Sequence, residues 1–343
     1  MGSGGFGDVY EGEWKGQNYA IKVIKANHSF VPDPDTKINE PILSNYADQS
    51  IYESLITAYL KSQDCRVVRT HKAFKCSDGK SYIVMDKLLG TDLNDLINIQ
   101  RTNYDIDHYF MLTYRMLCGL TCCHRNGIIH GDIKTENIFI ERTEHPEGFE
   151  GTLGYNPIYI DFGLSCFDEE NSKRFQAFVN ENLDPSLLEH FRKTRKCSLR
   201  FGGGTPYYTA PEFLGIKGLR NDKSMPKMDR LKLQDSYSLG LTLYFMWIGG
   251  DPNHRVKNIQ DYKKLIQEAT LKGGPSMSLD YFHYDVPDEI VDIIAGLIET
   301  DYTQRITVEQ ALDTLKNGFL MAQVYELPDE RCGSKFKYPY PTE

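Results

Sequence analysis

The sequence lacks any long apolar run, and this absence argues against a membrane-spanning helix. No apolar stretch reaches the roughly 18 residues that a helix needs to cross a bilayer. The chain begins with a glycine-rich stretch that has neither a basic region nor an apolar core, so it does not resemble a secretion signal. We therefore expect an intracellular protein, cytoplasmic or nuclear, with no membrane partner.

Close cysteine pairs and an excess of basic charge are absent as well. The eight cysteines are scattered over 343 residues without any C-x-x-C pair, and Cys122 and Cys123 are adjacent on an expected helix that would pack them in the core. We expect reduced thiols rather than a disulfide framework. The net charge of −9 argues against a nucleic-acid partner, because phosphate binding needs a basic surface.

What the chain does contain is the composition of a soluble globular protein. Hydrophobic residues make up 40% and charged residues 25%, which is ordinary for a protein that buries a sizeable core. The length of 343 residues predicts about two domains or lobes.

The first 86 residues are expected to form a small, mostly β lobe. Alternating residues and tight glycines predict a hairpin, followed by a polar, proline-containing insertion at about 26–49 and then by apolar residues at helical spacing. The predicted strands cover residues 9–10, 19–23, 67–74 and 82–85, and the predicted helix covers 50–61.

The following residues, 87–316, are expected to form a larger helical lobe. A helical stripe of apolar residues covers 105–125, and Gly127 is a plausible stop signal just after it. Residues 317–343 are rich in tyrosine, proline and lysine and predict a C-terminal tail. Further helices are predicted over 231–248, 288–299 and 307–315.

Four short motifs occur in a fixed order along these lobes. They are a glycine-rich stretch at 2–7, Lys22 in Tyr-Ala-Ile-Lys, the loop His-Gly-Asp-Ile-Lys-Thr-Glu-Asn at 130–137, and Asp-Phe-Gly at 161–163. In this order they resemble the motifs of the eukaryotic-type protein kinase family. The resemblance covers nearly the whole chain. It implies a two-lobed α+β fold that holds ATP and Mg²⁺ between a small β lobe and a larger helical lobe.

The glycine-rich stretch is a weak motif when taken alone. Gly2, Gly4 and Gly7 form G-x-G-x-x-G, in which backbone N–H groups can approach phosphates without a Cβ clash. A dinucleotide-binding fingerprint has the same letters but requires a strand before it and a helix after it, whereas strand-like residues follow here. Protein kinases place a strand before the first glycine, and we expect that strand to be missing because only Met1 precedes Gly2.

The resemblance assigns the other nucleotide contacts to the small lobe and the connection between the lobes. Lys22 would lie against the α- and β-phosphates, oriented by a helix carboxylate. Glu53 is the expected partner of this lysine, and Glu40 is the alternative. The adenine would be covered by Val9 and Ala20 and would meet the hinge at Met85, Asp86 and Leu88.

The central loop and the Asp-Phe-Gly motif carry the chemistry that the resemblance implies. Asp132 would accept or orient the proton of the substrate hydroxyl, and Lys134 would neutralise charge on the transferred phosphoryl group. Asn137 and Asp161 would bind Mg²⁺ through hard oxygen ligands. His130 is expected to pack under the phenylalanine of Asp-Phe-Gly rather than to transfer protons.

Gly131 stands where most protein kinases have an arginine that pairs with a phosphate on the activation segment. The resemblance therefore predicts activity without phosphorylation of that segment. His-Gly-Asp also resembles the small-molecule phosphotransferases of the aminoglycoside and choline type, which are the alternative class of enzyme.

Residues downstream favour a protein kinase over that alternative. The segment 204–212 resembles the substrate-docking segment, in which Thr205 would form hydrogen bonds with Asp132 and Lys134. This pattern is similar to that of serine/threonine kinases. The small-molecule kinases lack the counterparts of Glu212 and Arg305, which would form a buried ion pair, and of Asp235, which would brace the catalytic loop.

The activation segment, residues 161–212, is long for this family. An inserted amphipathic helix is predicted over 175–196, and it ends in the basic run 192–196. A solvated helix face accounts for such charges, and docking of a partner or an acidic substrate is the alternative.

The sequence thus predicts an ATP- and Mg²⁺-dependent protein kinase that transfers the γ-phosphoryl group to Ser or Thr hydroxyls of protein substrates. The alternative from another functional class is a pseudokinase, a scaffold with the same fold. The expected lack of the first strand supports the pseudokinase. The joint presence of Lys22, Asp132, Asn137 and Asp161 argues against it.

Overall fold

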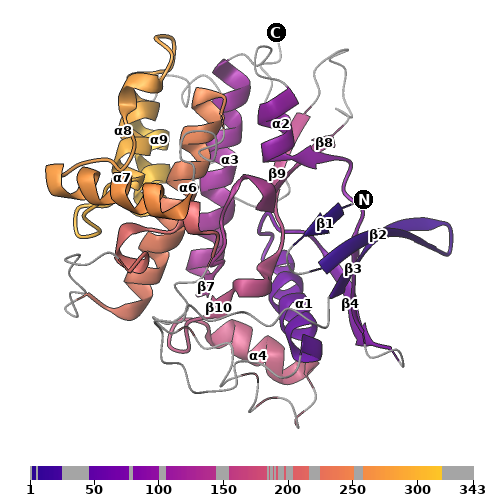
Figure 1. Cartoon of the computed structure of the whole chain (residues 1–343). Helices are drawn as coiled ribbons and strands as arrows, with labels where there is room; N and C mark the ends of the chain where they lie inside the picture. The colour runs from indigo at the N-terminus through magenta and orange to yellow at the C-terminus, as the bar shows by residue number, and fades with distance from the viewer. Residues whose placement is uncertain are drawn as a thin grey trace.

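A computed structural model shows two lobes, one built around a β-sheet and one mainly helical (Figure 1). This arrangement confirms the predicted two-lobed α+β fold. Among the described residues, no helix combines the length and the apolar character needed to cross a membrane. The structure describes residues 2–4, 7–24, 46–76, 80–99, 106–143, 154–183, 204–215, 225–250 and 258–318, together with 185, 188, 191 and 197.

The small lobe is a five-stranded antiparallel sheet in the order β1-β2-β3-β5-β4, with one helix packed against it. Alternate residues of each strand face opposite sides of the sheet, so one side can be buried against the helix. The strands are β1 (Gly2–Gly4), β2 (Gly7–Trp14), β3 (Gln17–Ile24), β4 (Thr70–Lys75) and β5 (Ser81–Asp86), and the helix is α1 (Tyr46–Ser62).

Strand β1 begins at Gly2, the first glycine of the motif, rather than before it. Gly2 pairs with Val9, and Gly4 pairs with Gly7. Extended backbone needs no side chain to form these pairs, so the glycines themselves make the edge strand. Most of the predicted insertion, including Glu40, lies outside the described residues, and α1 begins before residue 50.

The register of the small sheet places the predicted nucleotide contacts on one face. Val9 pairs with Lys22, and Ala20 pairs with Met85. Directly opposed residues of antiparallel strands share a face, and so do residues two apart on one strand. Val9, Ala20, Lys22 and Met85 therefore lie on the same side of the sheet.

The larger lobe is organised around helices, with two small sheets where it meets the small lobe (Figure 1). The helices predicted for this lobe correspond to α3, α6, α8 and α9, whereas α2 and α7 were not predicted. The helices are α2 (Leu93–Ile99), α3 (Ile106–Arg125), α4 (Lys173–Asn182), α6 (Lys227–Ile248), α7 (Ile259–Lys272), α8 (Asp288–Leu297) and α9 (Val308–Gly318). The strands are β6 (Gly90–Asp92), β7 (Ile128–Ile129), β8 (Ile138–Thr143), β9 (Gly154–Tyr159) and β10 (Cys166–Phe167).

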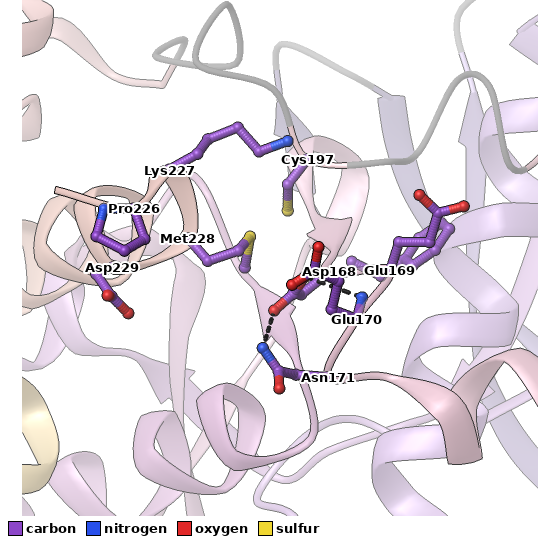
Figure 2. A pocket seen from close by; sticks show the side chains of 10 residues that line it. Asp168, Glu169, Glu170, Asn171, Cys197, Pro226, Lys227, Met228 and Asp229 are labelled. Carbon is purple, nitrogen blue, oxygen red and sulfur yellow. Dashed lines mark hydrogen bonds between the residues drawn. The ribbon is translucent and has the colours of Figure 1, made fainter. Parts of the chain in front are cut away.

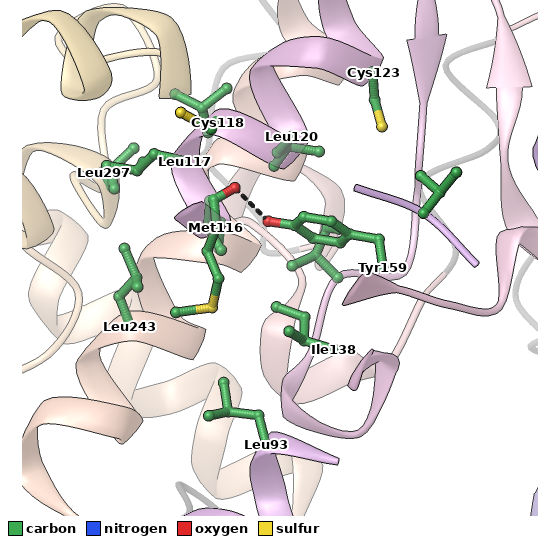
Figure 3. Packing of buried hydrophobic residues seen from close by; sticks show 14 of the residues in the cluster. Leu93, Met116, Leu117, Cys118, Leu120, Cys123, Ile138, Tyr159, Leu243 and Leu297 are labelled. Carbon is green, nitrogen blue, oxygen red and sulfur yellow. Dashed lines mark hydrogen bonds between the residues drawn. The ribbon is translucent and has the colours of Figure 1, made fainter. Parts of the chain in front are cut away.

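A buried tyrosine at the end of β9 joins this strand to helix α3 in the core of the large lobe. The hydroxyl of Tyr159 donates to the carbonyl of Met116 in α3 at 2.7 Å (Figure 3). Burial raises the pKa of Tyr159 well above its usual value, so the phenol stays a neutral donor. Because Tyr159 lies two residues before Asp161, its anchoring positions the Asp-Phe-Gly segment. The cluster around it includes Leu93, Leu117, Leu120, Ile138, Leu243 and Leu297.

Two disulfides correct the expectation that the cysteines are reduced. Cys65 is bonded to Cys122, and Cys166 is bonded to Cys197, at sequence separations of 57 and 31. Separations of this size leave no local motif, and only the folded chain brings the partners together. Disulfides persist mainly in oxidising compartments, and the expected intracellular location stays a prediction. Cys123, next to Cys122, is a buried free thiol.

Candidate active site

The ammonium group of Lys22 lies in a buried ion-pair network between the lobes. Its Nζ is 2.9 and 3.0 Å from the two carboxylate oxygens of Glu53 and 2.8 Å from Oδ1 of Asp161. Burial would lower the pKa of Lys22, but the two carboxylates outweigh burial and raise it above its usual value. Burial would likewise raise the pKa of Asp161, but Lys22 holds it below its usual value. Lys22 and Asp161 are therefore both charged at neutral pH.

Helix α1 brings Glu53 to Lys22 and is itself joined to the sheet by a partly buried hydrogen bond. The hydroxyl of Thr57 donates to the carbonyl of Glu53 at 2.9 Å and shares a 2.7 Å hydrogen bond with the hydroxyl of Thr70 on β4. A polar contact of this kind fixes the distance between helix and strand more narrowly than an apolar contact would. The structure thus places Glu53, one of the two predicted candidates, against the lysine.

The Asp-Phe-Gly segment holds its aspartate in an uncommon backbone conformation. Asp161 has φ 60° and ψ 69°, the left-handed region, and its Oδ1 accepts a hydrogen bond from the N–H of Gly163 at 3.4 Å. Phe162 is fully buried, and its ring centroid lies 4.5 Å from that of His130. His130 therefore packs against this phenylalanine as predicted. Strained non-glycine residues of this kind occur mainly at functional sites.

The carboxylate of Asp132 is held by hydrogen bonds from two directions. Its Oδ1 accepts from the N–H and the hydroxyl of Thr205 at 2.8 and 3.0 Å. Its Oδ2 accepts from Nδ2 of Asn137 at 3.1 Å, and Nζ of Lys134 lies 3.7 Å from the same oxygen. The structure therefore brings the four predicted residues of this loop and docking segment together around one carboxylate.

A second aspartate holds the backbone of the catalytic loop, which confirms the role expected for Asp235. Its Oδ2 accepts from the N–H of His130 at 2.8 Å, and its Oδ1 accepts from the N–H of Gly131 at 2.9 Å. Gly131 has φ +82°, and a Cβ there would lie 2.7 Å from the carbonyl oxygen of Leu164. Glycine at this position therefore relieves both backbone strain and a steric clash.

The predicted buried ion pair is also present. The guanidinium of Arg305 meets both carboxylate oxygens of Glu212 at 2.8 and 3.0 Å, and the two side chains are almost fully buried. The Nε of Arg305 donates to the carbonyl of Glu299 at 2.8 Å. This bidentate pair ties the docking segment to the loop before α9.

The hinge contains a residue whose side chain points away from the predicted nucleotide face. Asp86 is paired in register with Tyr19, next to the Ala20–Met85 pair, so its side chain lies on the opposite face. There its carboxylate contacts Nε2 of His71 at 2.6 Å. The N–H of Asp86 donates to the carbonyl of Arg69 at 2.9 Å. The side chain and the N–H of Asp86 are therefore not free to contact the adenine, and contacts from the Asp86 carbonyl and the Leu88 backbone stay predictions.

The glycine-rich hairpin is described in part. Gly2 and Gly4 form β1, and Gly7 begins β2. A Cβ at Gly7 would lie 2.5 Å from the carbonyl oxygen of Val23, so only glycine permits this approach of β2 to β3. The two residues between β1 and β2 lie outside the described residues.

A separate pocket of about 340 Å³ lies between the end of β10 and the start of α6 (Figure 2). Sequence reasoning missed this pocket, because its two walls, residues 167–171 and 226–229, are far apart in the sequence and meet only in the folded chain. The acidic run after β10 was the one visible signal. The wall includes Asp168, Glu169, Glu170, Asn171, Cys197, Lys227, Met228 and Asp229.

The predicted insert in the activation segment is only partly described. Helix α4 covers its first part, whereas the basic run 192–196 lies outside the described residues. Docking of a partner through that run therefore stays a prediction.

Oxygen atoms of Asn137 and Asp161 fit a hard divalent cation. Nδ2 of Asn137 is engaged by Asp132, which leaves its Oδ1 as the ligand atom. Asp161 has Oδ2 beside the Oδ1 that contacts Lys22. Within the described ranges, no group of three or more His, Cys, Asp or Glu side chains could hold a metal alone. A Mg²⁺ ion would therefore take its remaining ligands from phosphate and water, as is common for this cation.

Comparison with known proteins identifies relatives of the whole arrangement. The protein kinase domain family matches residues 1–315. The chain is 26% identical over 316 residues to calcium-dependent protein kinase 4 of Plasmodium falciparum (isolate 3D7), covering 91% of this chain and 47% of that protein. It is 24% identical over 322 residues to serine/threonine protein kinase ypkA of Aspergillus fumigatus, covering 93% and 39%. It is 26% identical over 315 residues to protein kinase C delta type of Homo sapiens, covering 90% and 35%. The chain spans less than half the length of these relatives.

Proposed function

This chain belongs to the eukaryotic-type protein kinase family, and on that premise we propose that it transfers the γ-phosphoryl group of ATP to serine and threonine hydroxyls of protein substrates. One observation carries the proposal. The Lys22–Glu53–Asp161 network and the hydrogen-bonded carboxylate of Asp132 are assembled in the same structure. A chain that had lost catalysis would have no need to keep both groups in place.

The proposed reaction depends on positioning more than on covalent chemistry. Thr205 and Asn137 fix both oxygens of the Asp132 carboxylate, so this group is oriented before the substrate arrives. The substrate hydroxyl would donate its hydrogen to Asp132 as its oxygen attacks the γ-phosphate in line. The ammonium of Lys134, beside Asp132, would stabilise charge on the transferred group.

The nucleotide would be held by the small lobe and by Asp161. Lys22, kept charged and oriented by Glu53, would lie against the α- and β-phosphates. The glycine-rich hairpin would cover the phosphates with backbone N–H groups. A divalent cation, proposed to be Mg²⁺, would be held by Asn137 and Asp161 and would neutralise phosphate charge.

Two observations support serine and threonine as the acceptors. Thr205 and Lys134 both lie against Asp132, a pattern that resembles the serine/threonine kinases. The relative from Aspergillus fumigatus is named a serine/threonine kinase. The Glu212–Arg305 pair and Asp235 also favour a protein kinase over the small-molecule phosphotransferases.

The test is transfer of labelled phosphate from ATP with Mg²⁺ to a generic protein substrate and to the chain itself. We expect label on serine or threonine, and we expect Asp132→Asn to lower the rate about 10²- to 10⁴-fold. Asp64→Asn is the matched control. Asp64 is exposed and has φ 59°, a conformation that asparagine tolerates.

Three results would contradict the proposal. No transfer by the wild-type chain would favour the pseudokinase. Label only on small alcohols or amines would favour the small-molecule phosphotransferase. Equal label from Asp132→Asn would assign the activity to a contaminating enzyme.

A further inference from the structure

The helix inserted in the activation segment packs on the helix that carries Glu53. Figure 1 shows α4 beside α1, and aromatic rings fill the contact. The ring centroid of Tyr59 lies 5.1 Å from that of Phe175 and 5.6 Å from that of Phe178. The ring centroid of Tyr52 lies 4.7 Å from that of Phe191. Apart from the half-buried Phe178, these side chains are almost fully buried.

The same rings also reach the strand that follows the Asp-Phe-Gly motif. Phe167 of β10 lies 5.5 Å from both Phe175 and Phe191, and these two rings lie 5.9 Å from each other. Aromatic pairs at such spacings attract each other beyond the simple burial of their area. One cluster therefore connects α1, the insert and the start of the activation segment.

Both ends of the insert are fastened. At its start, the N–H of Asp168 donates to the carbonyl of Gly127 at 2.8 Å, and Asn171 donates to the carboxylate of Asp168 (Figure 2). The disulfide between Cys166 and Cys197 closes the segment into a loop. The aromatic cluster therefore belongs to a segment whose two ends are both fixed, one by hydrogen bonds and the other by a disulfide.

The position of Glu53 on α1 couples the cluster to the ion pair. Tyr52 and Tyr59 are seven residues apart, about two helical turns, so they lie on one face of α1. Glu53 follows Tyr52 directly, about 100° further around the helix axis. A rotation or outward shift of α1 that separated Glu53 from Lys22 would also pull both tyrosines out of the cluster and expose them.

We propose that the described part of the inserted segment, residues 166–183 with 191 and 197, is a built-in positioning element that holds α1 so that Glu53 stays on Lys22. Phe175 and Phe191 are its positioning residues, since they act through α1. The inference rests on the proposed function, because it concerns how the nucleotide-binding lysine of the same site is kept in place. It also gives the insert a role that needs no phosphate on the activation segment.

The test compares variants of the full chain. Phe175→Ala is expected to lower kcat/KM for ATP about tenfold or more, and Phe175→Leu, which refills most of the space, is expected to restore most of it. Phe282→Ala is the matched control, because this half-buried ring packs on Tyr244 in α6 at 5.3 Å. It should stay within about twofold of wild type.

A second readout does not depend on activity. Hydrogen exchange of the amides of α1 should be faster in Phe175→Ala than in wild type and unchanged in Phe282→Ala. Phe178→Ala, which removes a half-buried ring, should shift both readouts in the same direction by less. If Phe175→Ala does not fold, Phe178→Ala tests whether the insert holds α1.

The outcomes separate this inference from the proposed function. If the wild-type chain transfers phosphate but Phe175→Ala and Phe178→Ala keep wild-type kinetics and wild-type exchange in α1, the inference is wrong. An equal loss in Phe282→Ala would overturn it too, because the effect would be general destabilisation. If the wild-type chain transfers no phosphate, the proposed function fails, and exchange in α1 still decides whether the insert holds this helix.

Discussion

The buried imidazole ring of His130 is neutral and bridges two backbone groups of the site through hydrogen bonds. Its Nε2 donates to the carbonyl of Ile160 at 3.1 Å, and its Nδ1 accepts from the N–H of Asp132 at 3.3 Å. Only the neutral tautomer with hydrogen on Nε2 satisfies both contacts. Burial lowers the pKa of His130 below the ordinary value of 6.5, although the nearby carboxylates, led by Asp235, oppose this shift.

The lowered pKa of His130 predicts a loss of stability in mild acid. Below about pH 6.5 the unfolded chain binds a proton at this residue that the folded chain does not bind. The free energy of unfolding should therefore fall by up to about 1.4 kcal/mol per pH unit from this group, until the folded pKa is reached. Urea unfolding at about pH 7.5 and about pH 5.5 should show a smaller fall for His130→Asn than for wild type. Equal falls would contradict this assignment.

Residue types fixed by chemistry could be predicted, whereas contacts fixed by register could not. Lys22, Asp132 and Asp161 were found in the sequence because they stand in short motifs whose order resembles that of the protein kinases. The contact of Asp86 with His71 depends on which residues of β4 and β5 lie opposite each other. No pattern along one strand contains that information.

At the scale of elements, the Glu212–Arg305 ion pair connects the docking segment to the loop before α9, and a single substitution in it should lower the stability of the fold. Arg305→Met would leave the Glu212 carboxylate buried without its charged partner. The free energy of unfolding should fall by about 3–5 kcal/mol, as measured by denaturant unfolding.

Matched controls for this pair come from the surface and from the pair itself. Arg125→Met removes an exposed pair with Glu309 and should cost less than about 1 kcal/mol. The double change Arg305→Met with Glu212→Leu should recover most of the loss, because no charge is then left buried. A loss from Arg305→Met no larger than that from Arg125→Met would show that the pair is not desolvated in solution.

Elements with a clear apolar period and clear end signals were predicted within a few residues. Helix α6 ends where Gly249 adopts φ 65°, and its N–H returns to the carbonyl of Met246. Helix α7 was missed although Asn258 caps its first turn through hydrogen bonds to the N–H groups of Gln260 and Asp261. The packing of α4 on α1 could not be read from either helix alone, because an amphipathic pattern does not say which surface covers it.

At the scale of the whole molecule, the disulfide between Cys65 and Cys122 joins the segment just after α1 to α3. It links two residues 57 positions apart and so connects the helix of the small lobe to the large lobe. Loop-closure entropy for such a link stabilises the folded state by up to about 4 kcal/mol. Cys122→Ser should therefore lower the unfolding midpoint, measured by thermal unfolding without reductant. Cys76→Ser, which removes an exposed free thiol, should not.

A dithiol reductant gives an independent check on both disulfides. It should lower the midpoint of wild type and release four more reactive thiols from the described part of the chain. An unchanged midpoint and thiol count would contradict the pairing. Neither pair was predicted, because the partners are 57 and 31 residues apart and meet only in the folded chain.

The aromatic face of α1 has a further consequence for how such a protein could be controlled. The chain covers the rings of Tyr52 and Tyr59 with its own insert, so an outside protein seeking this face would first have to displace Phe175 and Phe191. While the insert covers this face of α1, no partner protein can bind there. Control of this chain by a partner at this face would therefore require the insert to leave α1 first.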